Sequence, residues 1–137
     1  MDLVLGHDKT VAEWAGQKFG VTIHPAYVAW GVINEAGELT GALIFFNFVR
    51  GGNVEFCAVG AVVRRGIMRE VARYVFVQLK CTRLTALVVR SNSRVQRMLI
   101  KTGFEYECTH KQHYGPTKKH DALVFVLSPE RAQKWID

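Results

Sequence analysis

The sequence predicts a fold of the mixed α/β class, with a central mixed, largely antiparallel sheet and helices on both of its faces. Two observations predict it. Three β-rich segments at 26–33, 39–49 and 54–59 are joined by short turns, which is typical of an antiparallel meander. A helical pattern then separates the last of these segments from another at 84–89, so a crossover should make these two strands parallel.

The first half of the chain begins with a short strand candidate at 2–5 and a helix at 7–20. Val11, Trp14 and Phe19 recur near helical spacing, and Gly20 is a suitable stop. Turn residues, among them Asn34 and Gly37, separate the three meander strands.

The second half alternates helices and strands. Apolar residues spaced by four predict a helix at 66–80, and a second apolar stripe predicts one at 93–103. Ser-Pro at 128–129 is a good start for a last helix. Strands are expected at 84–89, 104–114 and 121–127, and the inward residues of the two helices are Ile67, Val71, Val75, Leu79, Val95, Met98 and Leu99.

Length and composition predict one domain over residues 1–137 that is cytoplasmic and spans no membrane. No apolar run approaches the ~20 residues of a membrane helix, and the start lacks a signal-peptide pattern. Cys57, Cys81 and Cys108 are odd in number and have no C-x-x-C spacing, so we expect reduced thiols. The net charge of +6 suits a phosphate-rich cofactor or a nucleic acid, or is simply a basic surface.

A phosphate site is predicted where the helix at 66–80 begins. Its first amides have no partner inside the helix and, with the helix dipole, attract anions. Arg64, Arg65 and Arg69 add positive charge around Gly66. The alternative is a helix start with a solvated basic face.

A ligand crevice is predicted beside that helix. If the parallel strands separate at their ends, backbone groups near Cys57 and Val59 become free to pair with a ligand that carries amides. Asn92 arrives at the same crevice, either only as a helix cap or also as a ligand contact. Arg94, Arg97 and Lys101 share one face of the helix behind it.

The stretch "NSRVQRMLIKTGF" at 92–104 resembles the N-x-x-A-x-x-x-L/Y-x-K-x-G-F helix and turn of the GNAT superfamily of acyl-CoA-dependent N-acetyltransferases. The order of elements is similar over roughly the whole chain. The pattern is closest to the enzymes that acetylate ribosomal-protein N-termini and to small phage- or prophage-encoded relatives. The last part of this chain, "DALVFVLSPERAQKW", also resembles the ending of the ribosomal-protein enzymes.

This resemblance implies a GNAT-like sheet with a splayed parallel strand pair, acetyl-CoA as the cofactor, and a primary amine as the acceptor. The amine, on a protein N-terminus or a small molecule, would attack the thioester directly. The resemblance assigns cofactor contacts to Cys57, Val59, Arg64, Arg65, Gly66, Ile67, Met68, Arg69, Asn92 and Arg97. The chain departs from the family at Met68, where a small residue is usual, and at Val95 and Leu99, where proton donors are usual.

Glu55 is the candidate general base, because the family that the sequence resembles often places a carboxylate on this strand. Alternation places Glu55 on one face with Cys57 and Val59, and the alternative is that Glu55 points to the other, solvated face of the sheet. Tyr106 and, as an alternative, Tyr114 are candidate acids. No metal site is expected, since His110 and His113 should point to opposite faces of a strand.

The alternative function is a catalytically silent domain of the same fold that binds acyl-CoA, RNA or a protein. Nucleic acid is the less expected partner, because no stacking-aromatic motif of RNA-binding modules is present, although the basic charge leaves it open. A homodimer is compatible with the sequence.

Overall fold

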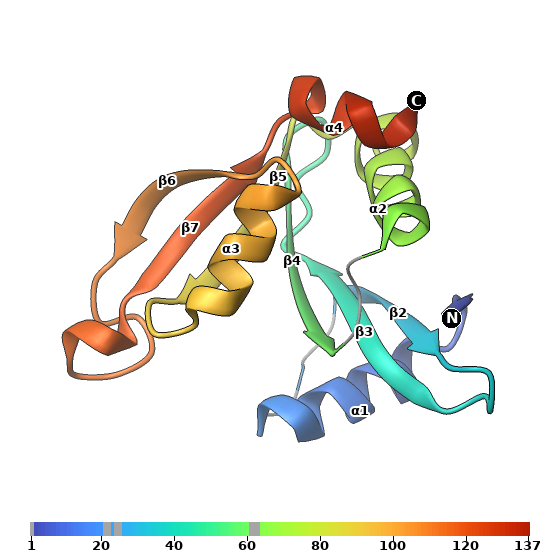
Figure 1. Cartoon of the computed structure of the whole chain (residues 1–137), viewed down its shortest axis with the longest axis horizontal. Helices are drawn as coiled ribbons and strands as arrows, with labels where there is room; N and C mark the ends of the chain where they lie inside the picture. Colours follow the sequence, from blue (N-terminus) through green and yellow to red (C-terminus); the bar gives the residue numbers. More distant parts are fainter. Residues whose placement is uncertain (1, 21–22, 24–25, 61–63) are drawn as a thin grey trace.

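The computed structural model describes residues 2–20, 23, 26–60 and 64–137. Its strands form a seven-stranded sheet in the order β1-β2-β3-β4-β5-β7-β6 (Figure 1). All neighbouring strands are antiparallel except β4 and β5, which are parallel, so the predicted mixed sheet is confirmed. The strands are β1 (Asp2–Val4), β2 (Tyr27–Ile33), β3 (Leu39–Phe46), β4 (Asn53–Gly60), β5 (Arg83–Val89), β6 (Glu105–His110) and β7 (Ala122–Leu127).

Helices cover both faces of the sheet, as the sequence predicts. Helix α1 (Asp8–Phe19) lies on one side of β2 and β3, and α2 (Arg65–Ala72) lies on the other (Figure 1). The α1 face is closed by a small cluster of buried side chains, which includes Val11, Ala15 and Ile44. The larger core lies on the α2 face, and α3 (Ser93–Lys101) and α4 (Pro129–Ile136) pack there as well.

The helix predicted at 66–80 is correct in place but not in form. It is an α-helix only to Ala72 and continues as a π-helical segment, η1 (Arg73–Gln78). Apolar residues four apart drift by about 40° per step around a regular helix of 3.6 residues per turn. Val71 in the α-helical part and Val75 in the π-helical part are both buried in the same core, so the change of helix type leaves the apolar stripe facing inward.

Two predicted strands are too long. The strand expected at 39–49 ends at Phe46, because Asn47 adopts a left-handed conformation with φ of 51°. The strand expected at 104–114 ends at His110, and a turn with Gln112 at φ 54° follows it. The sequence prediction also missed a short 3₁₀ turn, η2 (Lys118–His120). Within the described ranges, no helix combines the length and the apolar character that crossing a bilayer requires.

Candidate active site

The parallel strands β4 and β5 separate in the middle of the sheet. Their pairing runs from Asn53 opposite Arg83 to Phe56 opposite Ala86 and ends there. Strand β4 nevertheless continues to Gly60, where its other edge still pairs with Gly41 of β3. The edge of residues 57–60 that faces β5 therefore has no strand partner among the described residues, and its backbone groups are available to a ligand.

A crevice of about 420 Å³ lies beside this separation, on the α2 face of the sheet. Its walls are mostly apolar, and the polar side chains that reach it include those of Asn92 and Arg94 at the start of α3. Asn92 caps that helix, since its side-chain oxygen accepts a hydrogen bond from the Val95 amide at 3.3 Å. The other lining residues are Leu43, Phe56, Ala58, Gly60, Met68, Val71, Val95, Met98, Leu99, Thr102 and Phe104.

The start of α2 supplies amides that have no partner within the helix. The Met68 amide donates the first hydrogen bond of the helix, to the Arg64 carbonyl at 2.9 Å. The amides of Arg65, Gly66 and Ile67 precede it, so they have no partner within the helix and carry the positive end of its dipole. A Cβ atom on Gly66 would meet nothing within 4 Å among the described residues, so the space beside its Cα atom is open.

Met68 turns away from this helix start. Its side chain is buried, with 8% exposed, and it lines the crevice. It therefore lies beside the route predicted for the cofactor arm and not over the amides that would hold a phosphate. Arg64 and Arg65 are exposed at the helix start.

Three of the predicted cofactor residues lie elsewhere. The Arg69 guanidinium donates to the Trp135 carbonyl of α4 at 3.4 Å. The Ile67 side chain is in the core, so only its amide can reach a ligand. Arg97 is exposed and does not line the crevice, whereas Arg94, three residues earlier, does. The sequence placed Arg94 on the same helix face but did not single it out.

Glu55 shares one face of β4 with Cys57 and Val59, as alternation predicts, and this is the α1 face, opposite the crevice. Its register partner on β3 is Phe46, and the partner of Cys57 is Ile44. Phe46, Cys57 and Val59 all pack against the α1 cluster. The Cys57 and Val59 side chains thus point away from the crevice, and only their backbone can contact a cofactor there.

The charge of Glu55 acts on the Cys57 thiol and on the Tyr114 phenol. Burial, and secondarily the charge of Glu55, raises the pKa of the Cys57 thiol to about 11, so this thiol is neutral at physiological pH and is a poor nucleophile. Burial also raises the pKa of Tyr114, with further contributions from Cys57 and Glu55. Tyr114 comes from the loop between β6 and β7, where its ring packs edge-on against His113 and its side chain is half exposed.

Tyr106 lies far from Glu55 in the sheet. It lies on β6, the outermost strand, which β5 and β7 separate from β4. Its ring packs edge-on against Phe125 at 6.0 Å, and its hydroxyl shares a hydrogen bond with Thr109 at 2.6 Å. Phe125 belongs to the core on the α2 face, whereas Glu55 is on the other face.

The geometry expected for the histidines is wrong. The rings of His110 and His113 are 5.7 Å apart, because His113 follows the end of β6 and lies in the turn. Among the residues that the structure describes, no three side chains of the His, Cys, Asp or Glu type gather in a metal-binding arrangement.

Comparisons with known proteins identify the fold. No family model matches the sequence, and no curated protein matches it. A mutant of the spermidine N-acetyltransferase SpeG from Vibrio cholerae superposes with a TM-score of 0.68 at 15% identity, covering 88% of this chain and 75% of that one. A chimera of that enzyme with hSSAT gives a TM-score of 0.72 at 11% identity, with both chains covered completely. The ribosomal-protein-S5-alanine acetyltransferase from Vibrio fischeri gives 0.65 at 14% identity, covering 86% of this chain and 67% of that one. The chain therefore has the fold of the GNAT acetyltransferases.

Proposed function

We propose that this chain is an N-acetyltransferase that moves the acetyl group of acetyl-CoA to a primary amine, on a protein N-terminus or a small molecule. The observation that carries the proposal is the separation of β4 from β5 beside an apolar crevice, which α2 lines near its N-terminus with Met68. The acetyltransferase names of the structural neighbours support it at the level of the fold.

The residues present fit CoA part by part. The open space at Gly66 and the amides of Arg65 to Ile67, with the charge of Arg64, suit a pyrophosphate. The unpaired edge of β4 at Cys57 to Val59 suits the two amides of a pantetheine arm. The apolar walls at Phe56, Ala58 and Met68 suit its methylene groups, and Asn92 and Arg94 are placed to contact it from α3.

The cofactor supplies an activated thioester, and the chain supplies position and proton transfer. The amine must lose a proton as its nitrogen bonds to the acetyl carbon, and the sulfur must gain one as its bond to that carbon breaks. We assign Glu55 as the group that takes the proton from the amine, directly or through water. The crevice residues Val95 and Leu99 cannot donate a proton, so we assign Tyr114, whose phenol is protonated at neutral pH, as the candidate donor.

The first test of this function is calorimetric titration with CoA, together with thiol release from acetyl-CoA over a panel of amines. The proposal predicts saturable CoA binding at a single site and amine-dependent thiol release. Absence of CoA binding at high micromolar concentration would contradict the proposal. Binding without turnover on any amine would instead favour the silent domain.

Tyr114→Phe and Tyr106→Phe form a matched pair that tests the choice of acid. Both variants remove one phenolic hydroxyl, but Tyr106 lies on the outermost strand with its hydroxyl bonded to Thr109, whereas Glu55 contributes to the raised pKa of Tyr114. We expect Tyr114→Phe to lower kcat by about tenfold or more, because general acid catalysis contributes on the order of a hundredfold or more. Tyr106→Phe should keep kcat within about twofold. The reverse order in steady-state rates would return the role to Tyr106.

A further inference from the structure

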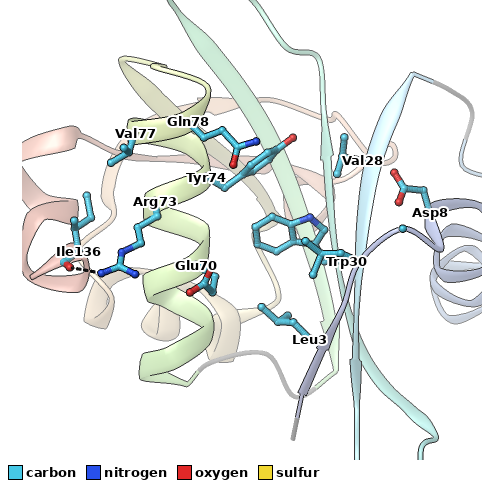
Figure 2. Close-up of a pocket in the computed structure, with 12 residues that line it drawn as sticks. Leu3, Asp8, Val28, Trp30, Glu70, Arg73, Tyr74, Val77, Gln78 and Ile136 are labelled. Carbon is cyan, nitrogen blue, oxygen red and sulfur yellow. Dashed lines mark hydrogen bonds between the residues drawn. The ribbon is translucent and has the colours of Figure 1, made fainter.

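A second pocket lies on the other side of α2 from the crevice. It has a volume of about 560 Å³ and is bounded by β1, β2 and the chain leading into α1 on one side, and by α2 and η1 on the other (Figure 2). It shares no lining residue with the crevice. It is also large enough for a small organic ligand, since such sites are typically about 300–1,000 Å³.

Two aromatic side chains form the base of this pocket. The rings of Trp30 and Tyr74 are 5.0 Å apart and tilted by 54°. Trp30 is only 5% exposed, yet no hydrogen bond among the described residues uses its indole N–H. In the described part of the chain, every fully buried polar side-chain atom has a hydrogen-bond partner. The indole N–H has none there, so it must be in contact with solvent. A buried indole normally finds an acceptor, so this one is available to a ligand.

Two carboxylates reach the same pocket from different elements. Glu70 comes from α2 and Asp8 from the first turn of α1, and neither belongs to a salt bridge among the described residues. The charge of Asp8, after burial, helps to raise the pKa of Tyr74, which agrees with its position at the aromatic wall. Asp8 is in the first turn of α1, where a carboxylate interacts favourably with the helix dipole. Glu70 has no such interaction, because it is in the middle of the continuous helical stretch 65–78.

The cation that lines the pocket is already engaged. Arg73 donates from Nη2 to the Ile136 carbonyl at the end of α4, at 3.5 Å, and Figure 2 shows its guanidinium directed toward Ile136 and away from Asp8. The pocket thus has two free carboxylates, an aromatic wall and apolar sides such as Leu3 and Val77, in a chain whose net charge is +6. Carboxylates beside aromatic faces are the groups that recognise organic ammonium ions.

We propose that this pocket binds a small organic cation. In this ligand, the linker between an ammonium group and an apolar body contains an oxygen that accepts a hydrogen bond. The ammonium group lies between Glu70, Asp8 and the aromatic faces, the acceptor takes the Trp30 indole N–H, and the apolar body covers Leu3 and Val77. This site is separate from acetyl transfer and does not depend on it. A quaternary ammonium has no N–H to lose, so it can occupy the pocket without being an acetyl acceptor.

Benzoylcholine is the probe that tests the site, because it has a quaternary nitrogen, an ester oxygen and an aromatic body. In ¹H–¹⁵N spectra of the whole chain, its titration should shift the indole N–H signal of Trp30. The signals of Trp14 and Trp135 should not move; the Trp135 N–H is bonded to the Thr102 carbonyl at 2.8 Å. The matched control ligand is 3,3-dimethylbutyl benzoate, in which carbon replaces the charged nitrogen.

Glu70→Gln should weaken benzoylcholine binding by about threefold, as expected for loss of one charge–charge contact at an exposed site. Glu13→Gln, which removes an exposed carboxylate of α1 outside the pocket, should leave the affinity unchanged. Thermal unfolding confirms that both variants are folded. Equal binding of the neutral ester, equal affinity of Glu70→Gln and the native chain, or shifts confined to the crevice residues would each overturn the proposal.

Discussion

Replacing Glu55 by glutamine is expected to lower kcat for amine acetylation by about a hundredfold or more, since a positioned general base contributes on the order of 10²–10⁴. Glutamine keeps the size of the side chain but cannot take the proton of the amine. Glu55 lies on the α1 face of β4, away from the crevice, so the affinity for CoA should stay within about twofold of the native value. Steady-state rates and calorimetry on the same preparation measure both quantities.

Glu35→Gln is the matched control for this variant. Glu35 is an exposed carboxylate in the turn between β2 and β3, so the same change of charge is made away from the site, and its kcat should be unchanged. If Glu55→Gln keeps more than half of the native kcat with a saturating amine, Glu55 is not the base. Loss of CoA affinity in this variant would show that it damages the sheet.

Gly60→Ala is expected to lower the free energy of unfolding by roughly 2–4 kcal/mol, the sum of a strained backbone and a steric clash. Gly60 has φ of 77°, a conformation that side chains disfavour. A Cβ atom here would also collide with the Thr40 carbonyl oxygen and lie 2.9 Å from the Gly41 Cα atom. These are backbone atoms of the paired strand β3, so they cannot move aside without opening the ladder. Urea unfolding followed by circular dichroism measures the change.

Gly66→Ala provides the contrasting control. Gly66 is within the first turn of α2, its Cβ position is empty, and alanine favours helix, so stability should stay the same or rise by about 0.5–1 kcal/mol. Its affinity for CoA should nevertheless fall, because the added methyl group lies where the pyrophosphate is proposed to approach. Equal stabilities of the Gly60 and Gly66 variants would contradict the role of Gly60 at the end of β4.

The sequence was sufficient for the features that depend on local pattern. Periodicity located α1 and α3, and Ser128 caps α4 as predicted, accepting a hydrogen bond from the Arg131 amide at 3.3 Å. Alternation along β4 correctly separated Glu55 and Cys57 from Phe56. The strand ends at Phe46 and His110 were missed because single residues, Asn47 and Gln112, adopt left-handed conformations that no periodicity reports.

The candidate site was harder to predict from the sequence, because it depends on contacts between side chains that are far apart along the chain. The bond of Arg69 to the Trp135 carbonyl joins residues 66 positions apart, and only the tertiary structure reveals that this cation is engaged. Likewise, Tyr114 and Tyr106 are equally plausible acids until strand order places β6 at the edge of the sheet. Helical spacing could have favoured Arg94 over Arg97, because Arg94 is one turn before Met98 on the crevice side of α3.

The most direct test of the proposed CoA site is an experimental structure of the chain with CoA. We expect the pantetheine arm to lie between β4 and β5 and to pair with the free edge of residues 57–60, with the pyrophosphate on the amides of Arg65, Gly66 and Ile67. The sulfur should lie near the level of Phe56 and Ala86, where the strands part. CoA bound elsewhere, or a crevice that Met68 keeps closed while CoA binds the surface, would contradict the proposed CoA site.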